Sequence, residues 1–284
     1  MGMSNEPGEI HLLKTVESEA DAARSRRSRP MVVVAFAMVV VLVGAAAFLY
    51  LRRGRTEPSA GARTPAADAV KVREDTQAVN LPPLDGTDAL VRQLVSALST
   101  HPVVAAWLAN ERLIVNFVVV TGRIAEGQSP ATELKSIGPV PPFRARASRG
   151  GVSIDPASYH RYDRYAQAVS AIDAGGAARV YETLKPRINE ADRNFGGAGT
   201  FDLVLERAIV ELLKVPPVDG DVALRSAGLG YVFADPTLEA MSPAQKQLFR
   251  MGQDNVRIIQ KKLREIASVL GIPESRLPQS APVQ

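Results

Sequence analysis

The ten residues "SYHRYDRYAQ", 158–167, contain three tyrosines, one histidine, two arginines and one aspartate. On a helix, Tyr159 and Tyr162 continue an apolar stripe, whereas His160 and Asp163 share another strip. This spacing is typical of partly buried tyrosines whose hydroxyls reach polar partners. The alternative interpretation is a ligand site. One histidine and one aspartate are too few ligands to predict a metal site.

A second stretch, "YVFADP", also combines aromatic residues with an aspartate and precedes the predicted C-terminal helix. If the domain has a ligand groove, we expect it to be lined by Tyr162, Asp163, Arg164, Asp235 and Arg250. Arginine beside tyrosine suits an anionic or sugar-like ligand, through charge-assisted hydrogen bonds and stacking. The alternative is that the two stretches only pack together, with Asp235 bonding the backbone near Pro236 and Arg250 bridging it.

Several classes of enzyme lack their signatures in this chain. There is no cysteine, which excludes disulfides, thiolate metal sites and cysteine nucleophiles. The motifs G-x-S-x-G, H-E-x-x-H and the phosphate-binding loop are also missing. The sequence therefore predicts no cofactor and no metal, and favours a binding or scaffolding protein. A hydrolase that uses carboxylates such as Asp155, Asp163 or Asp235 is the alternative.

The positive net charge does not indicate a nucleic-acid partner. Residues 1–80 contain 11 Lys/Arg and 9 Asp/Glu, and residues 81–272 contain 22 and 20. The folded part is thus close to neutral, and much of the local basic density surrounds one apolar segment.

That segment, "MVVVAFAMVVVLVGAAAFLYL" (Met31–Leu51), is uncharged, with four arginines shortly before it and three shortly after it. About 20 apolar residues match the hydrocarbon thickness of a bilayer. Ala45 and Ala47 resemble a signal-peptide cleavage site, but 30 residues precede the apolar run and it continues to Leu51. The sequence predicts an uncleaved transmembrane helix that contacts the lipid bilayer through residues 31–51.

The charges beside this segment leave its orientation open. Residues 11–30 and 52–71 each contain five Lys/Arg, so the positive-inside count is a tie. The denser arginine cluster favours a cytoplasmic segment 1–30. Residues 52–80 are small and polar, which is typical of a flexible linker. A globular domain 81–272 would then lie in the periplasm.

The pattern of this domain predicts a mainly α fold with one or two small β-hairpins, that is, a helix-rich α+β class. "ERLIVNFVVVTGRIAEG" suits helix or strand, and the spacing of its large apolar residues favours helix. Three further helices are predicted to begin after Thr87, at Pro102 and at Pro156. Two more are predicted over 176–195 and 200–214, and a last one is predicted to run without a break from Pro243 to Leu270.

The hairpins are predicted in "FRARASRGGVSID" and "VALRSAGLGYVF", where apolar residues alternate on both sides of a turn. "ADPTLEAM" is interpreted as a loop. Ser242 and Gln245 form a capping box with Pro243 at the first helical position. The proline-rich segment 273–284 is predicted to be a disordered tail.

Several stretches also carry a family resemblance, most specifically "YVFADPTLEAMSPAQKQLFRMGQDNVRIIQKKLREI". With "LPPLDGTDAL", "WLANERLIVNFVVVTGRIAEG", "ASYHRYDRYAQAVSAID" and "FDLVLERAIVELL", which occur in order and cover nearly all of residues 81–270, it resembles a bacterial family known as domain of unknown function 3014. The resemblance implies one domain, an uncleaved N-terminal anchor and the envelope of a Gram-negative cell, with the anchor in the inner membrane. It implies no activity and no catalytic residues. The expected partners are therefore the bilayer and an envelope protein or polymer.

Overall fold

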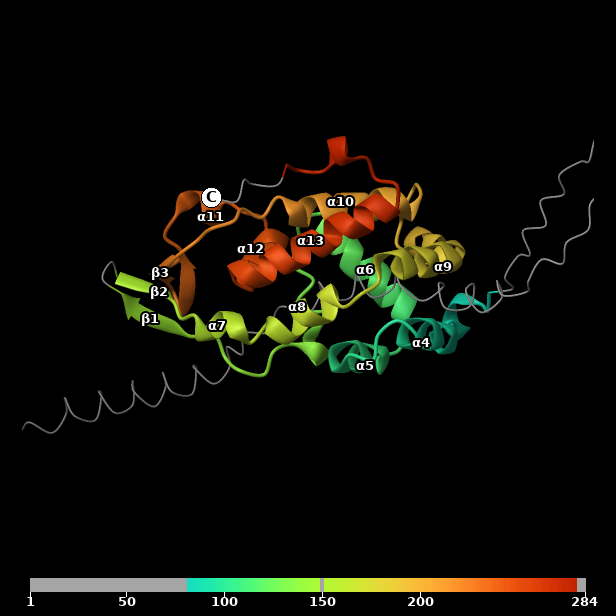
Figure 1. Cartoon of the computed structure of the whole chain (residues 1–284), viewed down its shortest axis with the longest axis horizontal. Helices are drawn as coiled ribbons and strands as arrows, with labels where there is room; N and C mark the ends of the chain where they lie inside the picture. The colour runs from blue at the N-terminus through green and yellow to red at the C-terminus, as the bar shows by residue number, and fades with distance from the viewer. Residues whose placement is uncertain (1–80, 149–150, 280–284) are drawn as a thin grey trace, which may run out of the picture. The chain divides into compact units, whose positions relative to one another are not determined.

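The described part of the chain is built mainly from helices, with a small sheet at one end (Figure 1). The computed structural model describes residues 81–148 and 151–279. Its α-helices are α4 (Asp88–Ser96), α5 (Pro102–Leu108), α6 (Leu113–Ala125), α7 (Ala157–His160), α8 (Asp163–Ser170), α9 (Ala174–Asn194), α10 (Phe201–Leu213), α11 (Pro236–Glu239), α12 (Pro243–Phe249) and α13 (Gln253–Val269). Short 3-10 helices are η1 (Leu84–Gly86), η2 (Lys135–Ile137) and η3 (Glu274–Arg276). The predicted helix-rich α+β class is confirmed for this part.

Helix α6 lies at the centre of the core, and its prediction as a helix is confirmed. The start of α6 is bonded to α4, because the Asp88 carboxylate of α4 accepts hydrogen bonds from the Arg112 and Leu113 N–H groups at 2.7 and 2.9 Å. These bonds satisfy donors that a helix N-terminus leaves free. The helix packs against α9 and α10, where the Phe117 and Phe201 rings lie 5.4 Å apart.

One position of α6 can be improved. A Cβ atom added at Gly122 would meet no atom within 4 Å. Alanine is favoured over glycine in a helix by about 1 kcal/mol. We therefore expect Gly122→Ala to raise the free energy of unfolding of the full chain by about 0.5–1 kcal/mol, measured by chemical denaturation. A decrease would contradict the open space around this residue.

The two predicted hairpins join into one antiparallel sheet in the order β1-β2-β3-β4. The strands are β1 (Ala145–Ser148), β2 (Gly151–Ile154), β3 (Ala223–Ala227) and β4 (Gly230–Phe233). Val152 pairs with Leu224, and Leu224 pairs with Phe233, so these apolar side chains share one face. Both hairpins are confirmed, and their union brings residues about seventy positions apart side by side.

Two helices predicted to be continuous are broken. The helix expected from Pro156 divides into α7 and α8 at Arg161–Tyr162. Tyr165, in α8 after the break, is buried, and its hydroxyl donates to the Ile137 carbonyl at 2.9 Å. The helix expected from Pro243 to Leu270 divides into α12 and α13, because Gly252 between them has φ 87°. The capping box of α12 is confirmed.

Two further corrections concern short segments. The predicted loop "ADPTLEAM" contains α11, where Pro236 occupies the first turn and Asp235 accepts a hydrogen bond from the Thr237 N–H at 2.7 Å. The predicted disordered tail is ordered through residue 279. Leu277 is buried there and Arg276 pairs with Glu206 at 3.1 Å, so contacts with the domain stabilise η3.

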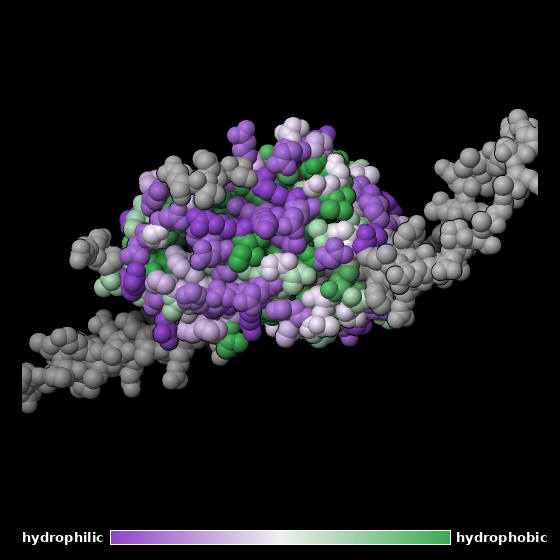
Figure 2. All heavy atoms as spheres, in the orientation of Figure 1, coloured by the Kyte–Doolittle hydropathy of each residue, from purple (hydrophilic) through white to green (hydrophobic). Residues whose placement is uncertain are grey.

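The predicted segments 1–30, 31–51 and 52–80, and the last tail residues 280–284, lie outside the described residues. Within 81–148 and 151–279, no single helix is long and apolar enough to cross a membrane. Helices α5 and α6 together reach that length and composition, but they are bent by 109° at the break between them. The face of the domain shown in Figure 2 is mostly hydrophilic, with hydrophobic side chains in scattered patches.

Candidate functional site

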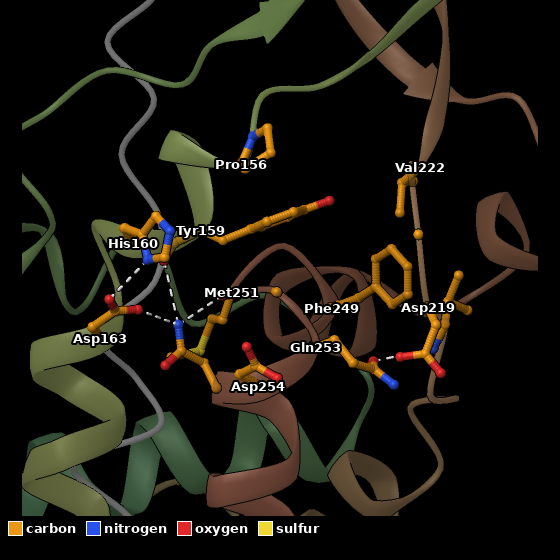
Figure 3. A pocket seen from close by; sticks show the side chains of 14 residues that line it. Pro156, Tyr159, His160, Asp163, Asp219, Val222, Phe249, Met251, Gln253 and Asp254 are labelled. Atoms are coloured by element: carbon orange, nitrogen blue, oxygen red, sulfur yellow. Dashed lines mark hydrogen bonds and ion pairs between the residues drawn. The ribbon is translucent and has the colours of Figure 1, made fainter. Parts of the chain in front are cut away.

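A cleft of about 310 Å³ lies where the sheet meets the two broken helices (Figure 3). We call it the Tyr159 cleft. One wall comes from α7 and α8, and a second from residues 218–222, which lead into β3. The third wall is the break between α12 and α13, from Phe249 to Asn255. Figure 3 shows the Tyr159 ring lying across the cleft and Phe249 facing it.

The close approach of Tyr159 to Gly252 shapes this cleft. A Cβ atom on Gly252 would lie 2.6 Å from the Tyr159 Cγ atom, so only glycine allows the ring to pack there. The backbone of Gly252, with φ 87° and ψ 155°, is also a conformation that essentially only glycine adopts. The same residue therefore ends α12, redirects the chain and makes room for the tyrosine.

Asn255 joins two walls of the cleft. It is 5% exposed, and its side-chain amide donates hydrogen bonds to the Asp163 carboxylate at 2.9 Å, the Met251 carbonyl at 2.9 Å and the Tyr159 carbonyl at 3.3 Å. The other oxygen of Asp163 lies 3.0 Å from His160 Nδ1. This network holds α7 and α8 against the start of α13.

Charged groups surround the opening. Asp219 pairs with Arg257 at 2.9 Å, and Asp254 lies 3.8 Å from the same arginine. The side chains of Asp219 and Asp254 are 78% and 95% exposed, so they remain available to a ligand. Among residues 81–148 and 151–279, no group of three or more His, Asp or Glu side chains is placed to hold a metal ion. The cleft thus offers carboxylates and aromatic walls for binding.

Tyr162 and Arg250 are the two predicted site residues that the structure brings close enough for the charge of Arg250 to influence the ionisation of the tyrosine. The Tyr162 residue is 1% exposed. The Arg161 guanidinium carbon lies 4.6 Å from the Tyr162 ring centroid, and that of Arg250 lies 5.7 Å from the Phe233 ring centroid. Arg250 therefore lies over a ring of "YVFADP" and within electrostatic reach of Tyr162 in "SYHRYDRY".

The other three predicted residues are placed elsewhere. Asp163 lines the Tyr159 cleft. Arg164 is exposed and donates a hydrogen bond to the hydroxyl of its neighbour Tyr165. Asp235 is exposed and caps α11, which matches the alternative in which it bonds the backbone near Pro236. The predicted five residues do not form one groove.

Burial changes the ionisation of the groups around Tyr162. It raises the pKa of Tyr162 to about 12, although the charges of Arg161 and Arg250 act against this shift. It also lowers the pKa of the Arg250 guanidinium, and the neighbouring charge of Arg161 acts in the same direction. Burial likewise raises the pKa of Tyr159 to about 12, with a further contribution from Asp221.

These shifts predict a loss of stability at alkaline pH. A tyrosine whose folded-state pKa is raised stabilises the fold fully below its ordinary pKa of 10.0, and this contribution is lost as pH rises towards about 12. We expect Tyr162→Phe, which removes one such group, to make the fall in the free energy of unfolding above pH 10.0 shallower. Denaturant titrations at a series of alkaline pH values measure it, and an unchanged slope would contradict the burial of the hydroxyl.

Sequence reasoning missed Gly252, Asn255 and Arg161. It placed Tyr159 on an apolar stripe, but not opposite a glycine. A signal for the break was present in "RMGQDN", where glycine precedes three polar residues inside an apolar helical pattern. Asn255 and Arg161 carry no such signal, because their partners are distant in sequence or belong to the backbone.

The comparisons with known proteins agree with the family resemblance. No curated protein and no solved structure matches the chain. A family model described as "Protein of unknown function (DUF3014)" matches residues 113–267, which include α6, the whole sheet, the Tyr159 cleft and the Arg250 region. The chain therefore belongs to the DUF3014 family.

Proposed function

We propose that this protein is a membrane-tethered binding or scaffolding module of the bacterial cell envelope. In this proposal, Met31–Leu51 spans the inner membrane once and segment 52–80 links it to a domain in the periplasm. The uncharged 21-residue run between arginine clusters supports the anchor. The domain then binds an envelope protein or polymer through the Tyr159 cleft.

The composition of the cleft is the observation that carries this proposal. Its volume of about 310 Å³ is at the lower end for small-molecule sites, so it suits one side chain or sugar unit of a larger partner. Tyr159 and Phe249 offer aromatic surface, and the exposed carboxylates of Asp219 and Asp254 offer hydrogen-bond acceptors at the opening. Such a mixture of apolar walls with a few polar groups is typical of recognition.

The hydrogen bonds of the candidate carboxylates favour binding over hydrolysis. Asp155 accepts from the Ala157 N–H at 2.9 Å, and Asp235 caps α11. Both oxygens of Asp163 are engaged, one by Asn255 and one by His160. A hydrolytic pair needs two carboxyl groups that face the substrate, with one of them free to transfer a proton. Each of these three instead has a structural partner.

Reporter fusions test the topology. An alkaline phosphatase fused after Asn80 should be active, because it would lie in the periplasm, and a reporter that functions only in the cytoplasm should be inactive there. The mature protein should retain residues 1–51. Cytoplasmic activity after Asn80, or a mature protein that begins near Phe48, would overturn the tethered arrangement.

Site-specific photo-crosslinking in cells tests the binding role of the cleft. A photoreactive residue at Asp254 should form a discrete adduct, whereas the same residue at the exposed Glu182 of α9, which does not line the cleft, should not. Identical adducts at both positions, or none at Asp254, would contradict the proposed site. Turnover of peptidoglycan fragments that Asp163→Asn abolishes would instead establish the hydrolase.

A further inference from the structure

The Arg250 side chain carries a charge that the domain does not neutralise directly. Among residues 81–148 and 151–279 its guanidinium makes no hydrogen bond or ion pair, and it lies 5.7 Å from the centroid of the Phe233 ring. Most buried arginines are paired, because the removal of an ion from water is costly in free energy. Arg250 is only partly exposed, so its charge is maintained at a cost to stability.

The nearest carboxylate is already engaged. Glu239 affects Arg250 through its charge. One Glu239 oxygen, however, accepts from Lys246 Nζ at 2.5 Å, and the other accepts from the Phe233 N–H at 2.9 Å. These bonds hold the carboxylate away from the arginine, although a bidentate arginine–carboxylate pair would be the ordinary solution.

A second cation adds to the charge instead of balancing it. Arg161 stacks on the Tyr162 ring and lies close enough to Arg250 for the two charges to repel each other. Its Nε and one terminal nitrogen donate to the Ser158 and Pro141 carbonyls at 2.9 and 3.1 Å, so Arg161 is held in place by neutral groups. Arg161 lies over the Phe143 ring, which contacts Tyr231 of β4, and Arg250 lies over Phe233 two residues further along the same strand, so both guanidinium groups lie against aromatic rings at one end of the sheet.

Aromatic rings surround this pair on the side of the sheet. Arg161 also lies 5.8 Å from the Phe143 ring, which contacts the Tyr231 ring at 6.3 Å. Tyr231 is 44% exposed, so the cluster reaches the surface. Guanidinium groups held by aromatic faces and backbone carbonyls are oriented in advance, which reduces the entropy lost when they bind an anion.

We propose that Arg250 and Arg161, on either side of the buried Tyr162, form a binding site for an oxyanion, that is, a carboxylate or phosphate group. The planar guanidinium of Arg250 would bind two oxygens of the ion, with Arg161 as a further donor. Arg250 lies between the cleft residues Phe249 and Met251 but is not among the residues that line the Tyr159 cleft. The proposal is therefore independent of the function proposed for that cleft.

Thermal unfolding of the full chain in phosphate, in succinate and in chloride at equal ionic strength tests this site. A ligand that binds only the folded state raises the unfolding midpoint with concentration. We expect a saturable rise of a few degrees in phosphate, in succinate or in both, relative to chloride. The more effective ion identifies the class of oxyanion, and the absence of a saturable rise in either would overturn the proposal.

Substitutions of single arginines test whether the rise in the unfolding midpoint depends on Arg250. Arg250→Met keeps the length of the side chain and removes the unpaired charge, so its midpoint in chloride should equal or exceed that of the wild type, while the rise with oxyanion disappears. Arg179→Met is the matched control, because Arg179 is an exposed arginine of α9 with its own partner, Asp173, and it should keep the full rise. A rise that Arg250→Met retains would overturn the site.

A lowered midpoint of Arg250→Met in chloride would show that the arginine stabilises the fold, and this would also count against the proposal. Arg250→Lys then provides the second measurement. Lysine keeps the charge but lacks the planar pair of donors, so the concentration of oxyanion at half-saturation should rise roughly tenfold with the chloride midpoint unchanged. An unchanged half-saturation would overturn the proposal.

Discussion

Gly252→Ala should lower the free energy of unfolding of the full chain by about 4 kcal/mol. Two effects combine. The backbone at φ 87° and ψ 155° is unfavourable for a residue with a side chain. The new methyl group would also lie 2.6–2.9 Å from three atoms of Tyr159, two of them at the base of the side chain, where rotation gives little relief. Denaturant titration measures the loss.

Two controls separate these effects. Gly271→Ala has a similar positive φ of 73° but no atom within 4 Å of the new Cβ, so it should cost only about 1 kcal/mol. In the background of Tyr159→Ala, which removes two of the three crowded atoms and leaves the Cβ atom at 2.7 Å, the cost of Gly252→Ala should fall but should stay above that of Gly271→Ala. An equal cost of Gly252→Ala in both backgrounds would contradict the packing of Tyr159 on this glycine.

Asn255→Asp should destabilise the chain by about 4 kcal/mol at neutral pH. The asparagine amide is a donor to three oxygens, those of Asp163, Met251 and Tyr159. A carboxylate of the same shape would place a buried negative charge against these acceptors, and one of them is itself a carboxylate. The loss should be seen as a lower denaturation midpoint and as an opening of the junction between α8 and α13.

The pH dependence of the destabilisation by Asn255→Asp tests whether the buried negative charge causes it. Burial and the charge of Asp163 would raise the folded-state pKa of the introduced carboxyl group above its unfolded value of about 3.9. The destabilisation relative to wild type should therefore be full above that raised pKa and should shrink as pH falls towards the unfolded value. Asn255→Leu is the control, because it loses the same bonds without adding a titrating group. Parallel pH profiles of the two variants would contradict this explanation.

The sequence by itself determined most of the local structure of this protein. Helix α6 follows from the spacing of its large apolar residues, and the start of α12 follows from the capping box of Ser242 and Gln245. Both hairpins follow from alternation around glycine-containing turns. These features depend on residues within a few positions of one another, which is why the pattern predicts them. Family membership is likewise a property of the sequence alone.

Only the tertiary structure decided how these elements meet. The pairing of Val152 with Leu224 joins the two hairpins, and no local pattern encodes that choice of partner. The breaks at Arg161–Tyr162 and at Gly252 depend on each other, because the Tyr159 ring packs on the glycine and Asn255 bonds across the junction. Helical periodicity continues through both breaks, so it predicted unbroken helices.

The candidate sites show the same division. Composition indicated that tyrosines, arginines and aspartates of two stretches were the groups to consider, and the structure brings Tyr162 and Arg250 together. It separates Asp163, Arg164 and Asp235 from them, because capping bonds and a helix break direct those side chains elsewhere. Contacts such as those of Asn255 with α7 and α8 join residues more than ninety positions apart, and their energies depend on burial that exists only after the chain has folded.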